Sequence, residues 1–160
     1  MQVEALLRDF PSRCRALGLA LTHQRMIIYH ELLASGDHPT PEAVYERVKA
    51  QIPAISLATV YKNIKLFLDV GLLREVSLHH GTLRLDANTA AHHHLVCKVC
   101  RRIFDLEESD LEPVRLKREL KTGFQIERCC IELHGVCAEC AQRPVESPTE
   151  LSNNELNRKS

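Results

Sequence analysis

Two Cys-x-x-Cys motifs constrain the fold of this chain more than any other feature of its sequence. The first spans Cys97 to Cys100 and the second spans Cys137 to Cys140. Zinc in structural sites takes four Cys or His ligands in tetrahedral geometry, and each motif presents two sulfurs on one side. A single motif is also compatible with a redox pair, but two motifs separated by a small folded segment are typical of one metal site. We therefore predict that the four cysteines hold one structural zinc ion, Zn²⁺.

The length and the cysteine usage of the chain limit its class and its compartment. Its 160 residues suffice for one large domain or two small ones. Seven cysteines occur without an N-terminal signal peptide, and no stretch is apolar enough to span a membrane. We therefore expect a cytoplasmic protein that does not contact membranes. Residues 1–86 contain ten Lys and Arg and nine Asp and Glu, so bulk charge does not indicate a nucleic-acid partner.

The first half of the chain is predicted to consist of short helices. Thr22, Thr40 and Ser56 are residue types that cap helix N-termini, and each precedes apolar residues at helical spacing. Pro11 is expected to interrupt the first helix, because proline removes a backbone donor. The side chains that the second helix is expected to bury are Met26, Ile27, Leu32 and Leu33.

A β-hairpin is predicted directly after these helices. Residues 72–78 and 83–86 are expected to be its strands, around a turn that contains Gly81. Three or four helices before a hairpin is the element order of a winged helix-turn-helix domain. We assign this domain to residues 1–86, and the small polar segment 87–91 to a hinge.

The second half of the chain is predicted to form a small α/β domain over residues 92–141. Strands are expected at residues 92–97 and 103–106, and imperfect alternation continues over residues 124–133. So small a unit would expose a sheet edge or an apolar face, so we expect it to form a homodimer. The fold class of the whole chain is therefore α+β.

Two further segments complete this half of the chain. Ser109 to Glu112 matches a capping box, which would open a helix that ends at Gly123. Residues 142–160 are rich in Pro, Ser, Asn and Glu, and they are predicted to be a disordered tail.

The histidine run before the first motif indicates a second metal site. His92 and His94 are two residues apart, so both project from the same face of a strand. A second metal suggests regulation or catalysis. A zinc enzyme with an open coordination position is the alternative from another class, but it lacks an obvious general base and leaves the winged-helix half unexplained.

Several motifs together resemble the ferric uptake regulator family, and the resemblance runs from about Leu17 to Cys140. The family consists of metal-dependent bacterial repressors. The resemblance implies a homodimer that binds a double-stranded DNA operator with an inverted repeat through its winged helix. The residues that carry it are His38-Pro39-Thr40, Ser56 to Asn63, His92-x-His94, the two Cys-x-x-Cys motifs and Asp105.

The resemblance also implies a regulatory metal site that joins the two halves of the chain. Three imidazoles and two carboxylates suit Fe²⁺, Mn²⁺ or Zn²⁺. The iron-uptake branch usually carries Glu at the position of Asp86, whereas the peroxide-sensing branch carries Asp. In that branch bound Fe²⁺ reacts with hydrogen peroxide and a ligand histidine, here His38 or His92, is oxidised. An iron- or zinc-uptake repressor of the same family is the alternative. The implied ligands are His38, Asp86, His92, His94 and Asp105.

A third metal site and a DNA-binding surface are implied in the same way. The third site would comprise His93, Glu112 and Cys129, where relatives more often carry histidine in place of Cys129. The neighbouring Cys130 is expected to face a core. The helix that starts after Ser56 is the candidate recognition helix, with core packing as the alternative for Tyr61. The implied DNA contacts are Tyr61, Lys62, Asn63, Thr59 and Arg25.

Overall fold

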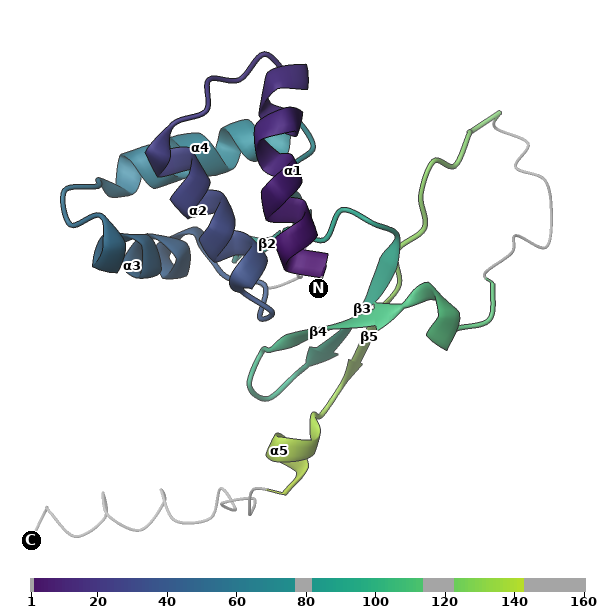
Figure 1. Cartoon of the computed structure of the whole chain (residues 1–160). Coiled ribbons are helices and arrows are strands. Elements are labelled where there is room, and N and C mark those ends of the chain that lie inside the picture. Colours follow the sequence, from purple (N-terminus) through teal and green to yellow (C-terminus); the bar gives the residue numbers. More distant parts are fainter. Residues whose placement is uncertain (1, 77–81, 114–122, 143–160) are drawn as a thin grey trace, which may run out of the picture.

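The computed structural model describes residues 2–76, 82–113 and 123–142. Four helices pack together at the N-terminal end, and a two-stranded antiparallel sheet follows them (Figure 1). This arrangement matches the predicted winged helix-turn-helix, although residues 77–81, which would hold the hairpin turn, lie outside the described residues. The helices are α1 (Gln2–Ala16), α2 (His23–Ala34), α3 (Pro41–Gln51) and α4 (Leu57–Asp69), and the strands are β1 (Arg74–Val76) and β2 (Arg84–Asp86).

Side-chain caps fix the start of three of these helices, as the sequence predicted. The Thr22 hydroxyl oxygen accepts a hydrogen bond from the backbone N–H of Arg25 at 3.3 Å. The Thr40 and Ser56 oxygens accept in the same way, at 3.2 and 3.1 Å, from the third residue after each cap. Each cap satisfies a backbone donor that the first helical turn leaves without a partner.

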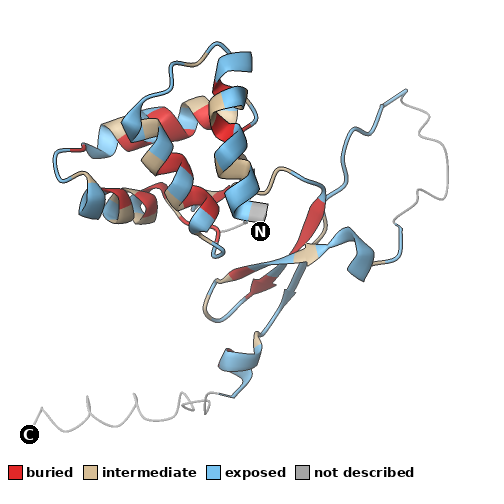
Figure 2. Ribbon diagram, in the orientation of Figure 1, coloured by how far each residue is buried: buried red, intermediate tan, exposed pale blue. Residues whose placement is uncertain are grey.

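Two predictions about the first helices were wrong. Helix α1 continues through Pro11, because Phe10 and Cys14 lie on one face of it and both are buried. In α2 the buried face is rotated: Ile28 and Tyr29 are buried together with the predicted leucines, whereas Met26 is 45% exposed. The rings of Phe10 and Tyr29 stack with centroids 4.2 Å apart, so α1 and α2 pack against each other through this pair. The helical half holds most of the buried residues (Figure 2).

The C-terminal half contains a three-stranded sheet in the order β4-β3-β5 (Figure 1). Strand β3 (His92–Cys97) lies in the centre, antiparallel to β4 (Ile103–Glu107) and parallel to β5 (Glu132–Gly135). The short helix α5 (Ala138–Ala141) follows β5. Both predicted strands around the first Cys-x-x-Cys motif are confirmed, and β4 is one residue longer than predicted.

Three other expectations for this half need correction or lie outside the described residues. The capping box forms between Glu107 and Asp110 around the 3₁₀ turn η1 (Glu108–Asp110) rather than from Ser109 to Glu112. Residues 111–113 are not helical, since a residue before proline, here Glu112, avoids helical backbone angles. Of residues 124–133, only the last two belong to a strand. The remainder of the predicted helix and the predicted tail fall on residues 114–122 and 143–160, outside the described residues.

Within the helical half of the chain, the loop before α3 contacts strand β2. The backbone N–H of Leu85 donates to the carbonyl of Pro39 at 3.0 Å. This contact places His38 and Asp86, the neighbours of those two residues, beside the central strand β3. No helix within the described residues is long and apolar enough to cross a membrane.

Candidate metal centres

The first candidate metal centre consists of the four cysteines of the two Cys-x-x-Cys motifs. Their Sγ atoms all lie within 4.8 Å of one another. Cys97 is the last residue of β3 and Cys100 follows that strand, whereas Cys137 caps α5 and Cys140 lies within it. The Sγ atoms of Cys100 and Cys137 are 3.7 Å apart, and two sulfurs at about 2.3 Å from a tetrahedral zinc would be about 3.8 Å apart. The four sulfurs therefore fit Zn²⁺.

Hydrogen bonds from the chain stabilise thiolate forms in this cluster. The backbone N–H of Cys137 donates to Cys97 Sγ at 3.4 Å, and this bond is the main reason that the pKa of Cys97 falls to about 5. Burial instead raises the pKa of Cys140 to about 12, and the neighbouring sulfurs add to the rise. The thiol of Cys140 would therefore stay protonated at neutral pH unless a cation held by the cluster stabilised its thiolate.

Arg102 is a member of this site that the motifs did not reveal. Its guanidinium donates to Cys100 Sγ at 3.5 Å and to Cys137 Sγ at 3.9 Å, and it also pairs with Glu139. Hydrogen bonds from Arg102, first from its side chain and then from its backbone, are the main cause of the lowered pKa of Cys100. The sequence feature that could have indicated this role is the position of Arg102 two residues after the first motif, where a cation can offset the charge of thiolates.

The second candidate metal centre lies where the two halves of the chain meet. Four side chains there, His38, Asp86, His92 and His94, place one ligand atom each within 4.8 Å of all the others, and all four are buried. Asp105 Oδ1 lies 3.1 Å from His38 Nε2 and 3.6 Å from His92 Nε2, on the more exposed side. The structure thus brings together all five side chains of the predicted regulatory site.

Each element supplies its ligand candidates for a local reason. His92 and His94 point to the same side of β3, with ring centroids 4.7 Å apart, as alternation along a strand predicts. Asp105 lies opposite His94 in the antiparallel register of β4. His38 has a left-handed backbone, with φ of +49°, which a residue other than glycine adopts at a cost on the order of 1 kcal/mol.

Local hydrogen bonds aim the remaining atoms at the centre of this cluster. His92 Nδ1 lies 3.0 Å from the carbonyl oxygen of Ala90, which leaves Nε2 directed at Asp86 Oδ2 at 3.2 Å. The backbone N–H of Asn88 donates to Asp86 Oδ1 at 2.7 Å, so Oδ2 remains for another partner. The Nε2 atoms of His92 and His94 are 3.0 Å apart, close to the separation of about 3.0 Å for two nitrogens bound at right angles to one metal at about 2.1 Å.

Several buried polar atoms of this cluster lack a hydrogen bond within the described part of the chain. They are both ring nitrogens of His38 and Oδ2 of Asp86, because the short distances from His38 to Asp105 and from Asp86 to His92 do not have hydrogen-bond geometry. Buried groups of this kind are rare and call for an explanation such as a bound ion. Burial also lowers the pKa of His94 to about 4 and raises the pKa of Asp86, whereas contact with His38 lowers the pKa of Asp105. His94 is therefore a neutral imidazole at physiological pH, which is the form that binds metals.

The third predicted metal site is not assembled. Among residues 2–76, 82–113 and 123–142, only the two clusters above bring three or more such side chains within 4.8 Å of one another. His93 points away from His92 and His94, and its Nδ1 accepts a hydrogen bond from the backbone N–H of Ile131 at 3.2 Å. Cys129 is exposed, and Cys130 is also exposed rather than in a core, with its Sγ 3.6 Å from His94 Nδ1.

Of the predicted DNA-contact residues, Asn63 is buried, whereas others lie at the surface or along a groove. Asn63 was expected on the outer side of α4, but it is 8% exposed, donates to the Thr59 carbonyl at 2.8 Å and accepts from Arg25 Nε at 3.1 Å. Its helical position puts it between the buried residues of α4, so it holds Arg25 in place. Tyr61 is 39% exposed and its hydroxyl bonds to Glu42. Arg25 and Lys62 line a groove between α2 and α4, together with Lys65, which the sequence analysis did not single out.

Comparisons with known proteins show the family of this chain. The model of the ferric uptake regulator family matches residues 16–134. The peroxide-responsive repressor PerR of Staphylococcus aureus is 31% identical over 141 residues, which cover 88% of this chain and 95% of that repressor. The structure of the Campylobacter jejuni peroxide stress regulator is similar with a TM-score of 0.60 and 28% identity, covering 73% of this chain and 88% of that one. The Helicobacter pylori ferric uptake regulator Fur shares the fold, with a TM-score of 0.66 and 16% identity over 88% of this chain and 95% of that one. The chain described here belongs to the ferric uptake regulator family.

Proposed function

We propose that this chain is a metal-dependent transcriptional repressor that senses peroxide through Fe²⁺ at the second metal centre. The observation that carries the proposal is the convergence of His38, Asp86, His92, His94 and Asp105 at the junction of the two halves. The relatives named for peroxide response support the sensing branch, as does aspartate at position 86. The four cysteines hold a separate structural zinc.

In this proposal, residues 1–86 bind DNA, residues 87–91 act as a hinge and residues 92–141 dimerise. A metal bound by His38 on one side and by His92 and His94 on the other would fix the angle between the halves. It stabilises the DNA-binding arrangement to the extent that it binds that arrangement more tightly than others. Bound Fe²⁺ would supply the one-electron chemistry that cleaves the O–O bond of peroxide, and the protein's part is to hold beside it the histidine that is oxidised by two electrons overall.

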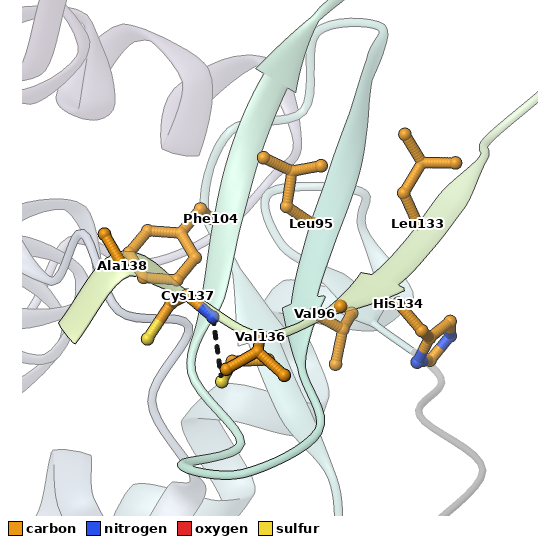
Figure 3. A pocket seen from close by; sticks show the side chains of 10 residues that line it. Leu95, Val96, Phe104, Leu133, His134, Val136, Cys137 and Ala138 are labelled. Carbon is orange, nitrogen blue, oxygen red and sulfur yellow. Dashed lines mark hydrogen bonds between the residues drawn. The ribbon is translucent and has the colours of Figure 1, made fainter. Parts of the chain in front are cut away.

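The proposed dimer surface is the apolar face of the C-terminal sheet. Leu95 on β3 is paired with Phe104 on β4 and with Leu133 on β5, so the three side chains form one row across the sheet. They are 37–43% exposed and line a cavity of about 380 Å³ with Val136 (Figure 3). A row of exposed apolar side chains on a small sheet favours burial against a second copy of the chain.

The proposed DNA-binding surface lies on α4 and the neighbouring groove, and it leads to a prediction for Tyr61 and Lys62. Tyr61→Ala is expected to weaken operator binding roughly 5–150-fold while affecting random DNA little, because a base contact is lost. Lys62→Ala is expected to weaken binding to both, and to reduce the salt slope by about one, because a phosphate contact is lost. The measurement is a salt titration on an inverted-repeat duplex selected in vitro and on a scrambled duplex.

The matched control is Tyr61→Phe, which removes the hydrogen bond to Glu42 and keeps the ring. If the ring reads a base, this variant keeps most of the operator affinity. Equal losses on operator and scrambled DNA for Tyr61→Ala would show that Tyr61 does not read bases.

The peroxide response is tested by loading the second centre with Fe²⁺ or Mn²⁺ and adding hydrogen peroxide briefly. The iron-loaded protein is expected to lose operator affinity. A peptide that contains His38 or His92 should gain one oxygen atom, while the other oxygen of the peroxide leaves as water. The manganese-loaded protein is expected to keep both its DNA binding and its mass, because Mn²⁺ does not readily drive this reaction. Operator binding by titration and peptide mass spectrometry are the two measurements.

The same experiment separates the alternatives. Iron-loaded protein that keeps its operator affinity and shows no oxidised histidine would contradict peroxide sensing, and an iron- or zinc-uptake repressor would then be the better account. The zinc-enzyme alternative is disfavoured because five side chains converge on the second centre and leave little room for a substrate. It predicts no dependence of DNA binding on added metal.

A further inference from the structure

His94 is flanked by a thiol on the side away from the second metal centre. Its Nε2 faces the cluster, 3.0 Å from His92 Nε2 and 3.9 Å from Asp86 Oδ2. Its Nδ1 lies 3.6 Å from Cys130 Sγ, on the opposite side of the ring. The sulfur therefore does not face the metal position at Nε2. It contacts the other ring nitrogen, Nδ1.

The second nitrogen of a metal-binding histidine normally donates its N–H to an acceptor, which fixes the tautomer and the orientation of the ring. His92 follows this rule with a backbone carbonyl, because its Nδ1 lies 3.0 Å from the oxygen of Ala90. For His94, the contact that the structure records at Nδ1 among the described residues is the sulfur of Cys130. A thiol sulfur is a weak acceptor, but it is an acceptor.

The backbone holds Cys130 in this position through the residue that follows it. The N–H of Ile131 donates to His93 Nδ1 at 3.2 Å, and the carbonyl of Ile131 accepts from the backbone N–H of His94 at 2.9 Å. Hydrogen bonds to these two neighbouring histidines of β3 thus hold the chain at Ile131 in place. Cys130 then borders a cavity of about 540 Å³ that Asp86 and His94 also line.

We propose that Cys130 is a positioning residue for the regulatory metal site. Its sulfur accepts the Nδ1–H of His94, which keeps the Nε2 lone pair directed at the metal. The inference rests on the proposed function, since it takes His94 to be a ligand. It assigns to Cys130 a role that differs from the structural zinc site, whose sulfurs belong to the two Cys-x-x-Cys motifs.

The test measures Mn²⁺ affinity on the full-length, zinc-loaded protein and its variants. Cys130→Ala is expected to bind Mn²⁺ about 10–100-fold more weakly, which is the usual effect of losing such a partner. Cys130→Ser should stay close to the unchanged protein, because a hydroxyl oxygen can accept the same N–H. Cys129→Ala is the matched control, since Cys129 is an exposed neighbour for which no hydrogen bond is recorded within the described residues. Zinc content and melting temperature should be the same in all variants.

A spectroscopic measurement adds a readout that a general loss of stability would not give. Long-range proton–nitrogen NMR of the protein with diamagnetic Zn²⁺ in both metal centres reports the Nδ1–H of His94 and its exchange with water. That N–H should exchange slowly in the unchanged protein and in Cys130→Ser, and faster in Cys130→Ala, where it has lost its acceptor. Unaltered Mn²⁺ affinity in Cys130→Ala, or an equal loss in Cys129→Ala, would overturn the proposal.

His94→Ala distinguishes this inference from the proposed function. If His94→Ala removes Mn²⁺ binding while Cys130→Ala leaves it intact, the metal site stands and only the role of Cys130 fails. If His94→Ala also binds Mn²⁺ normally, the regulatory site itself is misassigned and the inference fails with it.

Discussion

Replacing Cys97 by serine is expected to release the structural zinc and to abolish the dimer. Structural zinc contributes about 10–16 kcal/mol of apparent binding free energy in zinc-finger peptides. Whole domains are stable by only about 5–15 kcal/mol. Cys97 ends the central strand β3 and its sulfur accepts the backbone N–H of Cys137, so its loss breaks the link between the two motifs. The C-terminal half should therefore lose its fold once zinc leaves.

The measurements are zinc content by elemental analysis, mass in solution and thermal unfolding. Cys129→Ser is the matched control, because Cys129 lies outside both metal clusters and should retain one zinc per chain. A Cys97→Ser variant that remains dimeric, with an unchanged melting temperature, would show that zinc is not part of the fold.

Replacing His38 by alanine is expected to leave the zinc and the dimer intact but to remove metal-dependent DNA binding. His38 is the histidine of the cluster that belongs to the helical half of the chain. Without it, the one proposed ligand left from residues 1–86 is Asp86, which lies next to the hinge, so a metal held by β3 no longer ties the helices to the sheet. Couplings between two sites are typically about 1–3 kcal/mol, which corresponds to roughly 5–150-fold in DNA affinity. Operator affinity should therefore become independent of added Mn²⁺, as a binding titration with and without metal would show.

A second variant separates the loss of a ligand from the backbone effect. His38 has a left-handed backbone with φ of +49°, which asparagine tolerates better than alanine. His38→Asn should thus keep the loop and still respond poorly to metal, since an amide is a weaker ligand than an imidazole. Full metal dependence in His38→Ala would contradict the proposed switch, because the metal would then act without this contact.

The metal clusters could be predicted from the sequence because ligand spacing is a local property. Cys-x-x-Cys places two sulfurs together whatever surrounds it, and alternation along a strand places His92 beside His94. Caps at Thr22, Thr40 and Ser56 were predictable for the same reason. The position of His38 and Asp86 beside these histidines is a long-range contact, and only the resemblance to a family indicated it.

The features that the sequence analysis missed depend on packing between distant segments. Helix α1 continues through Pro11 because Phe10 stacks on Tyr29 of another helix. Asn63 is a polar residue at a buried position, and its reason for being there is Arg25, 38 residues earlier. Cys130 was expected in a core because cysteine is usually buried. Its contact with His94 follows from the parallel pairing of β5 with β3, which no local pattern reveals.

The central strand β3 carries residues of both metal centres, and this sets an order of assembly. His94 and Cys97 are three positions apart on one strand, or about 10 Å. Strand β5, which pairs with β3, is followed by the second pair of zinc-binding cysteines. We therefore expect the regulatory site to form only in molecules that have already acquired zinc. A cell short of zinc would make chains that cannot respond to iron or manganese at all, so the supply of one metal decides how many sensors there are for another.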